Sequence, residues 1–190
     1  MAAVGMGNML INVICFALCQ GFNGTIETFV SQSFGGGDSY MCGVQFNRGR
    51  IIVSILFIPI VLIFFFGDNI LIAVDQDPYI SKISRDYVVW AIPGLYAIVQ
   101  FDSRKRYLQS MQYSFVSTYA QMVGCFLHFF WCLYFIVELE LGWFGCSICL
   151  NITYITTFAI QEFYVLVYKR AVFDHYRAPL FEEESFLDWP

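Results

Sequence analysis

Three polar side chains near the N-terminus, Gln20, Asn23 and Glu27, repeat at a spacing that places them on one face of a helix. The surrounding segment is apolar, and polar groups inside a membrane either line a cavity or bond to a neighbouring helix. Both roles are compatible with this stripe. Glu27 is its ionisable member, and a carboxylate shielded from water can take up and release a proton. We therefore expect Glu27 to be the most consequential charged group within the apolar segments.

A second feature that bears on function is the dipeptide Pro93-Gly94, which stands in the middle of another apolar segment. Proline lacks a backbone N–H group, and its ring crowds the carbonyl group four residues earlier. The segment is therefore predicted to form a bent helix. Pro93 and Gly94 are the candidate hinge of a protein that changes shape.

Other chemistry has little support in the sequence, and we expect neither an enzyme nor a resident cofactor or metal. No nucleophile–base pair or phosphate-binding glycine loop is present. Cys146 and Cys149 have the spacing of half a zinc or redox site, but no second pair accompanies them. His128 is interpreted as a packing residue, and Glu162 is expected at the inner membrane interface or paired with Arg170.

The composition identifies a membrane protein. Of the 190 residues, 58% are hydrophobic and only 13% are charged, whereas a soluble domain usually carries roughly 25% charged residues. The lipid bilayer is therefore the first expected partner. The net charge of -5 resides largely in an acidic tail, and no basic face suggests binding to nucleic acid.

Five apolar segments are long enough to cross a bilayer, which takes about 20 helical residues. Runs of this length form helices, because the strands of a membrane barrel need only about 10 alternating residues. The fold class is therefore all-α, a polytopic bundle of about five transmembrane helices. The segments cover about residues 4–34, 51–74, 83–101, 119–137 and 143–168, and 171–190 is a cytoplasmic linker or tail.

The connectors between these segments alternate between basic and acidic. Lys and Arg in short loops are retained on the cytoplasmic side of a membrane. The alternation therefore predicts an external N-terminus and a cytoplasmic C-terminus. The cytoplasmic residues would be Arg48, Arg50, Arg104, Lys105, Arg106, Lys169 and Arg170, and the external ones Asp75, Asp77, Glu138 and Glu140.

Two separated stretches resemble a known transporter family. Residues 21–50 are similar to the second helix and following cytoplasmic loop of the multidrug and toxic compound extrusion (MATE) transporters. Residues 92–112 resemble the fourth helix of that family and the loop after it. The matching positions include Glu27, Thr28, Gln32, Arg48, Pro93, Gly94, Gln100, Tyr107 and Gln109.

The resemblance implies a twelve-helix transporter of two six-helix lobes, of which the five segments would be helices two to six. The first helix and the second lobe have no counterpart in the sequence. The leading hypothesis is therefore part of a secondary antiporter that exports drugs, organic cations or metabolites in exchange for H⁺ or Na⁺. Glu27, Asn23 and Gln20 would line its cavity, and the second lobe would complete the site.

Two alternatives remain beside this hypothesis. The chain would be a non-transporting truncated remnant, or a membrane interaction subunit held by helix packing. A flippase for a lipid-linked sugar is disfavoured, because a pyrophosphate group calls for basic residues in mid-span and the segments contain none there.

Overall fold

The predicted all-α architecture is confirmed in the computed structural model, which describes residues 2–168. The expected tail over 171–190, with Lys169 and Arg170, lies outside the described residues. The helical elements are α1 (Ala2–Leu10), α2 (Ala17–Gly35), α3 (Ser39–Phe65), α4 (Gly67–Ala73), α5 (Pro78–Ser110), α6 (Ser114–Cys132) and α7 (Gly142–Tyr168), with π-helical segments η1 (Ile11–Phe16) and η2 (Leu133–Glu138).

The first helix is a single rod in which α1, η1 and α2 follow one another without interruption, from Ala2 to Gly35. It ends at the glycine run. Gly37 takes a positive φ of 79°, a conformation that glycine adopts without steric cost. Asp38 then begins α3, because its carboxylate accepts a hydrogen bond of 2.9 Å from the Met41 N–H group.

The apolar run at 51–74 forms two helices rather than one continuous segment. Helix α3 begins twelve residues before Ile51, at the Asp38 cap, so Arg48 and Arg50 belong to a helix and not to a connecting loop. It ends at Phe65, and the short helix α4 follows from Gly67. Gly67 lies beside the first helix, where a Cβ atom would make an ordinary contact with Leu10 at 3.4 Å.

Helix α5 is longer than its apolar segment at both ends. Asp77 caps its N-terminus by accepting hydrogen bonds from Tyr79 and Ile80 at 2.9 and 3.1 Å, and Pro78 occupies the first helical position, which proline favours. At the other end the helix continues to Ser110. The basic triplet at 104–106 therefore lies on helical turns, whereas the sequence placed it in a connector.

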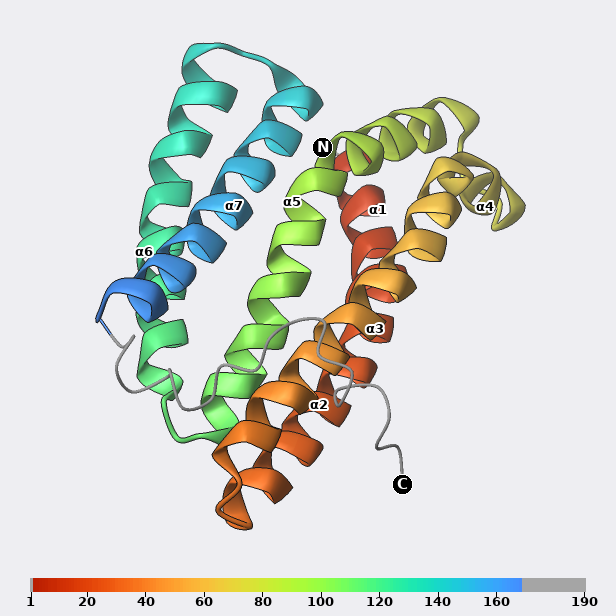
Figure 1. The fold of residues 1–190 in the computed structure, drawn as a ribbon. Coiled ribbons are helices and arrows are strands. Elements are labelled where there is room, and N and C mark those ends of the chain that lie inside the picture. The colour runs from red at the N-terminus through yellow and green to blue at the C-terminus, as the bar shows by residue number, and fades with distance from the viewer. Residues whose placement is uncertain (1, 169–190) are drawn as a thin grey trace.

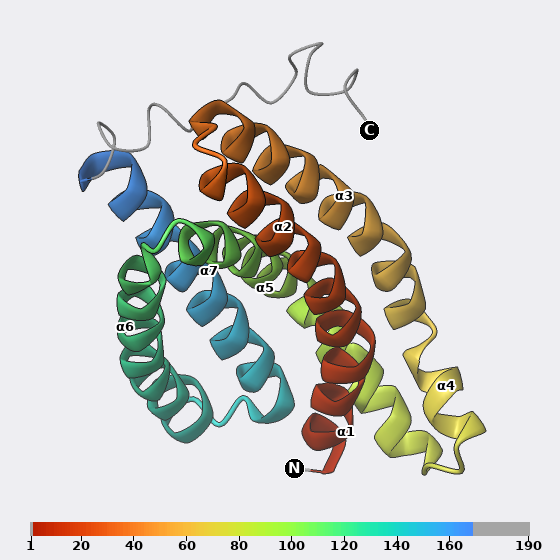
Figure 2. The same ribbon diagram turned by 90° about the horizontal axis from the view of Figure 1, so that it is seen from below.

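Four helices of the described chain are long and apolar enough to span a membrane: Ala2–Gly35, Ser39–Phe65, Ser114–Glu138 and Gly142–Val167. Helix α5 differs because charged residues at 82–86 and 102–106 bracket a shorter apolar centre. It nevertheless runs through the middle of the bundle, with α2 and α3 on one side and α6 and α7 on the other (Figures 1 and 2). The most polar helix is thus the central one.

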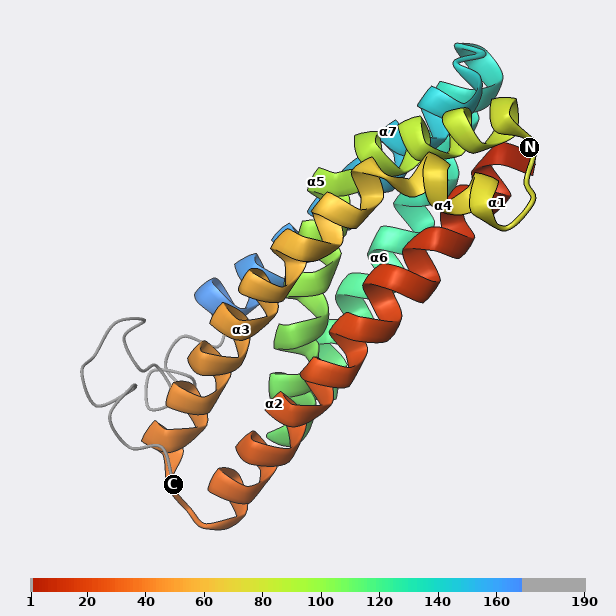
Figure 3. The same ribbon diagram turned by 90° about the vertical axis from the view of Figure 1, so that its right-hand side faces the viewer.

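The helices alternate in direction, as Figure 3 shows for the α1–α2 rod beside α3. The α2–α3 and α5–α6 connections lie at one end of the bundle, and α4 and the α6–α7 connection lie at the other (Figure 1). Arg48 and Arg50 of α3 and the triplet at 104–106 of α5 therefore lie toward the first end, whereas Lys82 and Arg85 lie on the early turns of α5 toward the second. Asp75, Asp77, Glu138 and Glu140 lie at the second.

The outward surface is apolar, as expected of helices that face lipid. Ile55 is 61% exposed and Phe126 is 66% exposed. Inside the bundle, small residues allow close approach. A Cβ atom at Gly49 of α3 would collide with Ile26 of α2, and one at Gly124 of α6 would collide with Thr157 of α7. These two contacts hold the helix pairs on either side of α5 together.

Candidate functional site

Arg106, on the last turns of α5, is the centre of a polar network that joins α5 to α2. Its Nη1 atom lies 2.7 Å from the Glu27 carboxylate, and its Nη2 atom donates to the Gln20 side chain at 3.2 Å. Its Nε atom lies 3.9 Å from Asp102, one turn earlier on the same helix. One guanidinium group therefore contacts two carboxylates and an amide, a geometry that suits its planar set of donors.

Asn23 anchors the buried side of this network. Its side chain is almost completely enclosed, with an exposed fraction of 1%. Its amide nitrogen donates to Asp102 at 3.0 Å, and its amide oxygen accepts from the Ser103 hydroxyl at 2.7 Å. Both ends of the amide are satisfied, as burial of a polar group requires. The stripe on α2 is thus bonded to α5 at Gln20, Asn23 and Glu27.

A cleft of about 190 Å³ adjoins the network. Gln20 and Asn23 line it from α2, Asp102 and Lys105 line it from α5, and Gln121 closes it from α6. Glu27 is not among the residues that line this cleft, and its carboxylate is held by Arg106. The two roles expected of the stripe therefore coincide at Gln20 and Asn23, which bond to α5 and border the cleft.

A second polar chain joins α5 to α3 and contains Gln100. Arg50 donates from Nε to the Gln100 oxygen at 3.0 Å, and the Gln100 nitrogen donates to the Ser54 hydroxyl at 2.9 Å. The Tyr96 hydroxyl lies 3.3 Å from Ser54. Gln100 is only 4% exposed, so these bonds satisfy an amide that lipid could not.

Tyr107 belongs to an aromatic platform at the same end of the bundle. Its ring stacks on Phe46 of α3 with centroids 4.3 Å apart. The guanidinium carbons of Arg50 and Arg104 lie 5.5 and 5.3 Å from the centre of the Phe46 ring, within the range of cation–π attraction. Arg104 also forms an ion pair of 2.7 Å with Glu162 of α7. The partner of Glu162 among the described residues is thus Arg104.

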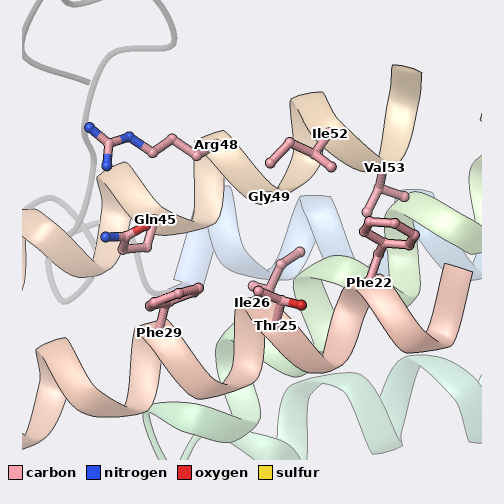
Figure 4. A pocket seen from close by; sticks show the side chains of 9 residues that line it. All are labelled: Phe22, Thr25, Ile26, Phe29, Gln45, Arg48, Gly49, Ile52 and Val53. Atoms are coloured by element: carbon pink, nitrogen blue, oxygen red, sulfur yellow. The ribbon is translucent and has the colours of Figure 1, made fainter. Parts of the chain in front are cut away.

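Arg48 borders an apolar groove between α2 and α3, separate from the cleft. The groove has a volume of about 230 Å³. Figure 4 shows the Arg48 guanidinium directed away from the groove, while Phe22, Ile26 and Phe29 face it from α2. Arg48 is 9% exposed. Its side chain therefore contributes the rim of this groove and not its centre.

The remaining family positions of the sequence lie on helix surfaces at the same end. The Thr28 hydroxyl donates to the Gly24 carbonyl at 3.0 Å within α2. The Gln32 carbonyl accepts from Gly36 at 2.9 Å and helps to end that helix. Gln109 is exposed on the last turn of α5. Their side chains take no part in the α2–α5 network.

The candidate hinge lies inside α5, which changes direction along its length (Figure 1). Pro93 is exposed, and Gly94 is buried against α7. A Cβ atom at Gly94 would lie 2.8 Å from both Cα and Oδ1 of Asn151. Glycine is therefore required here for the approach of α7.

His128 contacts Thr153 at 2.8 Å and Cys132 at 3.3 Å, which agrees with its interpretation as a packing residue.

Sequence reasoning missed the residues of α5 that receive the stripe. Asp102, Ser103 and Arg106 all lie beyond or at the edge of the apolar segment, where the sequence predicted a connector. A usable signal was present, since Asp102 and Arg106 are four residues apart and oppositely charged, as in a helical ion pair. It becomes informative only if the helix is known to continue to Ser110.

Comparison with known proteins identifies the family. A family model described as MatE matches residues 1–134. The chain belongs to the MatE family. MatE proteins are multi-pass integral membrane transporters and not enzymes, and their transport is typically coupled to H⁺ or Na⁺.

Relatives and a solved structure agree with this assignment. Protein DETOXIFICATION 7 of Arabidopsis thaliana is 29% identical over 157 residues, 81% of this chain and 31% of that protein. Multidrug and toxin extrusion protein 2 of Oryctolagus cuniculus is 31% identical over 124 residues, 65% of this chain and 21% of that protein.

The crystal structure of the eukaryotic MATE transporter AtDTX14 has the same fold, with a TM-score of 0.88 and 18% identity. The match covers 97% of this chain and 41% of that one. The MatE chain thus spans about a third or less of the length of the curated relatives named above.

The network predicts a difference between two adjacent cations on α5. Arg106→Ala removes the partner of Glu27 and Gln20, and we expect it to lower the stability by about 1–2 kcal/mol, since the pair is partly exposed. Lys105→Ala is the matched control and should change stability by less than about 0.5 kcal/mol. Thermal unfolding in detergent measures both. Equal losses would show that Arg106 has no special role in joining α5 to α2.

Proposed function

We propose that this chain forms part of the first lobe of a MatE antiporter, which exports organic cations, drugs or metabolites in exchange for H⁺ or Na⁺. The observation that carries this proposal is the charged network on the border of the cleft. Two carboxylates, Glu27 and Asp102, share the cation Arg106. Lys105 lies beside them in the cleft wall. In such an arrangement, binding of a proton or a cation to one carboxylate changes the contacts between two helices.

The mechanism follows from the charges. When Glu27 binds a proton, it loses the charge that attracts Arg106, and the contact between α2 and α5 weakens. Arg106 then remains beside Asp102, and Gln20 loses its donor. The lining of the cleft is rearranged by one proton or by one competing cation. A second transporter lobe would supply the opposite wall, and Gln20 and Asn23 would contact the small-molecule substrate.

Pro93 and Gly94 give the lobe a place to bend during this rearrangement. A helix that already departs from regular bonding can change its angle at low cost. The bend lies in the same helix as Arg106, so a change at the network is transmitted along α5. The alternative is a non-transporting remnant or interaction subunit, in which the network serves helix packing alone. Transport experiments separate the two.

The transport test uses vesicles that carry the natural gene product containing this chain. We expect a fluorescent organic cation to accumulate when a proton or sodium gradient is imposed. Glu27→Gln keeps the shape and much of the hydrogen bonding but cannot titrate. It should reduce proton-driven accumulation roughly tenfold, which is within the usual range of coupling between sites. Gln32→Glu, on the exposed surface outside the network, is the control and should transport normally.

Two outcomes would contradict the proposal. If the wild-type protein inserts normally and accumulates nothing above empty vesicles, the chain is not part of an antiporter. If the wild-type protein transports and Glu27→Gln retains full proton-driven transport at normal expression, the antiporter stands and the role of Glu27 in coupling is wrong.

The orientation is also part of this proposal, with the N-terminus outside and the basic end of the bundle in the cytoplasm. Single cysteines at Gly37 and Gln76, in the connections at opposite ends, test it in a background without the native cysteines. A membrane-impermeant maleimide added to intact cells should label the cysteine at position 76 and not the one at position 37. The reverse pattern would invert the topology.

A further inference from the structure

A side chain from α7 bonds to the backbone of α5 beside Pro93. In a regular helix the Gly94 N–H group donates to the carbonyl of Trp90, four residues earlier. Here the Asn151 amide bonds to both of these groups. Its oxygen accepts from the Gly94 N–H group, and its nitrogen donates to the Trp90 carbonyl at 2.7 Å. One side-chain amide therefore engages both groups that a backbone hydrogen bond of the helix would join.

The position of the Asn151 contact follows from Pro93. Proline has no N–H group to offer to the Val89 carbonyl, and its ring pushes that turn open. The next pair along the helix, Gly94 and Trp90, lies in the same turn. Because hydrocarbon cannot satisfy exposed backbone groups, a neighbouring helix must do so. Asparagine is suited to the task, since its amide carries both a donor and an acceptor, as a peptide group does.

Helix α7 is held against α5 for this contact by its own bonds. The Asn151 nitrogen also donates to the Ser147 carbonyl at 3.0 Å, which fixes the side chain over its helix. The Ser147 hydroxyl donates to the Tyr87 carbonyl at 3.1 Å, one turn before Trp90. Two residues of α7, four positions apart, thus bond to the backbone of α5, and Gly94 leaves the room for them.

We propose that Asn151 is the positioning residue that maintains the bend of α5. The Gly94 and Trp90 backbone groups have two ways to be satisfied: through Asn151 in the bent helix, or through each other in a closed turn. With proline at position 93 the closed turn is disfavoured, so the bent helix depends on the contact between α5 and α7. This inference concerns the fold of the lobe and holds whether or not the chain transports.

A double-mutant cycle in the chain itself tests the proposal. Asn151→Leu keeps the approximate volume but removes both hydrogen bonds, and it should lower the Tm in detergent by about 4–8 °C. In a Pro93→Ala background, Asn151→Leu should lower the Tm by less than about half of its effect in the wild-type chain. Alanine at position 93 allows the Trp90–Gly94 bond to form, so the Asn151 bonds are no longer needed. Gln161→Leu makes the same kind of change ten residues further along α7, where Gln161 donates to the Ser117 hydroxyl of α6 at 2.8 Å, so its loss should be equal in both backgrounds.

Equal losses for Asn151→Leu in the two backgrounds would mean that Asn151 serves helix packing only, and the proposal would be wrong. If Asn151→Leu does not fold, recovery of folded protein on adding Pro93→Ala supports the proposal, and failure to recover overturns it.

Amide hydrogen exchange at Gly94 gives a local readout that general packing would not change. We expect exchange at Gly94 to accelerate at least about tenfold in Asn151→Leu, where its N–H group has lost its acceptor. Adding Pro93→Ala should restore the protection. Unchanged exchange at Gly94 in the single variant would also refute the proposal, since it would show that Asn151 is not the acceptor.

Discussion

Hydrocarbon offers no hydrogen-bond partners, and this constraint governs the arrangement of the bundle. The central helix, α5, carries the most polar groups, and each of its neighbours satisfies a different set. Glu27 and Gln20 of α2 bond to Arg106 of α5. Arg50 and Ser54 of α3 bond to Gln100 of α5. Helix α7 bonds through Asn151 to the backbone of α5 next to Pro93. The polar contacts therefore decide which helices lie beside α5.

The same contacts connect the fold to the proposed transport. A polar bond between helices is strong in lipid only while both partners keep their charge and geometry, so a proton or an organic cation in the cleft can alter it. The network between α2 and α5 lies beside the cleft, and the Asn151 contact between α7 and α5 lies near the bend. In the proposed mechanism, a change at the first site would reach the second through one continuous helix. Helix α5 is the framework of the lobe, and we propose that it is also the element that adjusts during transport.

Much of this fold could be predicted from the sequence, because apolar length and glycine punctuation are local signals. The helical stripe of Gln20, Asn23 and Glu27 was visible in its spacing, as was the end of α2 at the glycine run. The extent of α3 and α5 was not, since charge pattern tells which end of a span a residue occupies but not whether it is helical. Asn151 was not predicted either, because its role depends on how α7 meets α5.

The central claim is that the charge on Glu27 joins α2 to α5 through Arg106. A cycle of Glu27→Gln, Arg106→Gln and the double variant, each measured by thermal unfolding in lipid nanodiscs, tests it most directly. We predict that the double variant loses clearly less stability than the sum of the two single losses, with a coupling of about 0.5–2 kcal/mol. Strictly additive losses would contradict the claim.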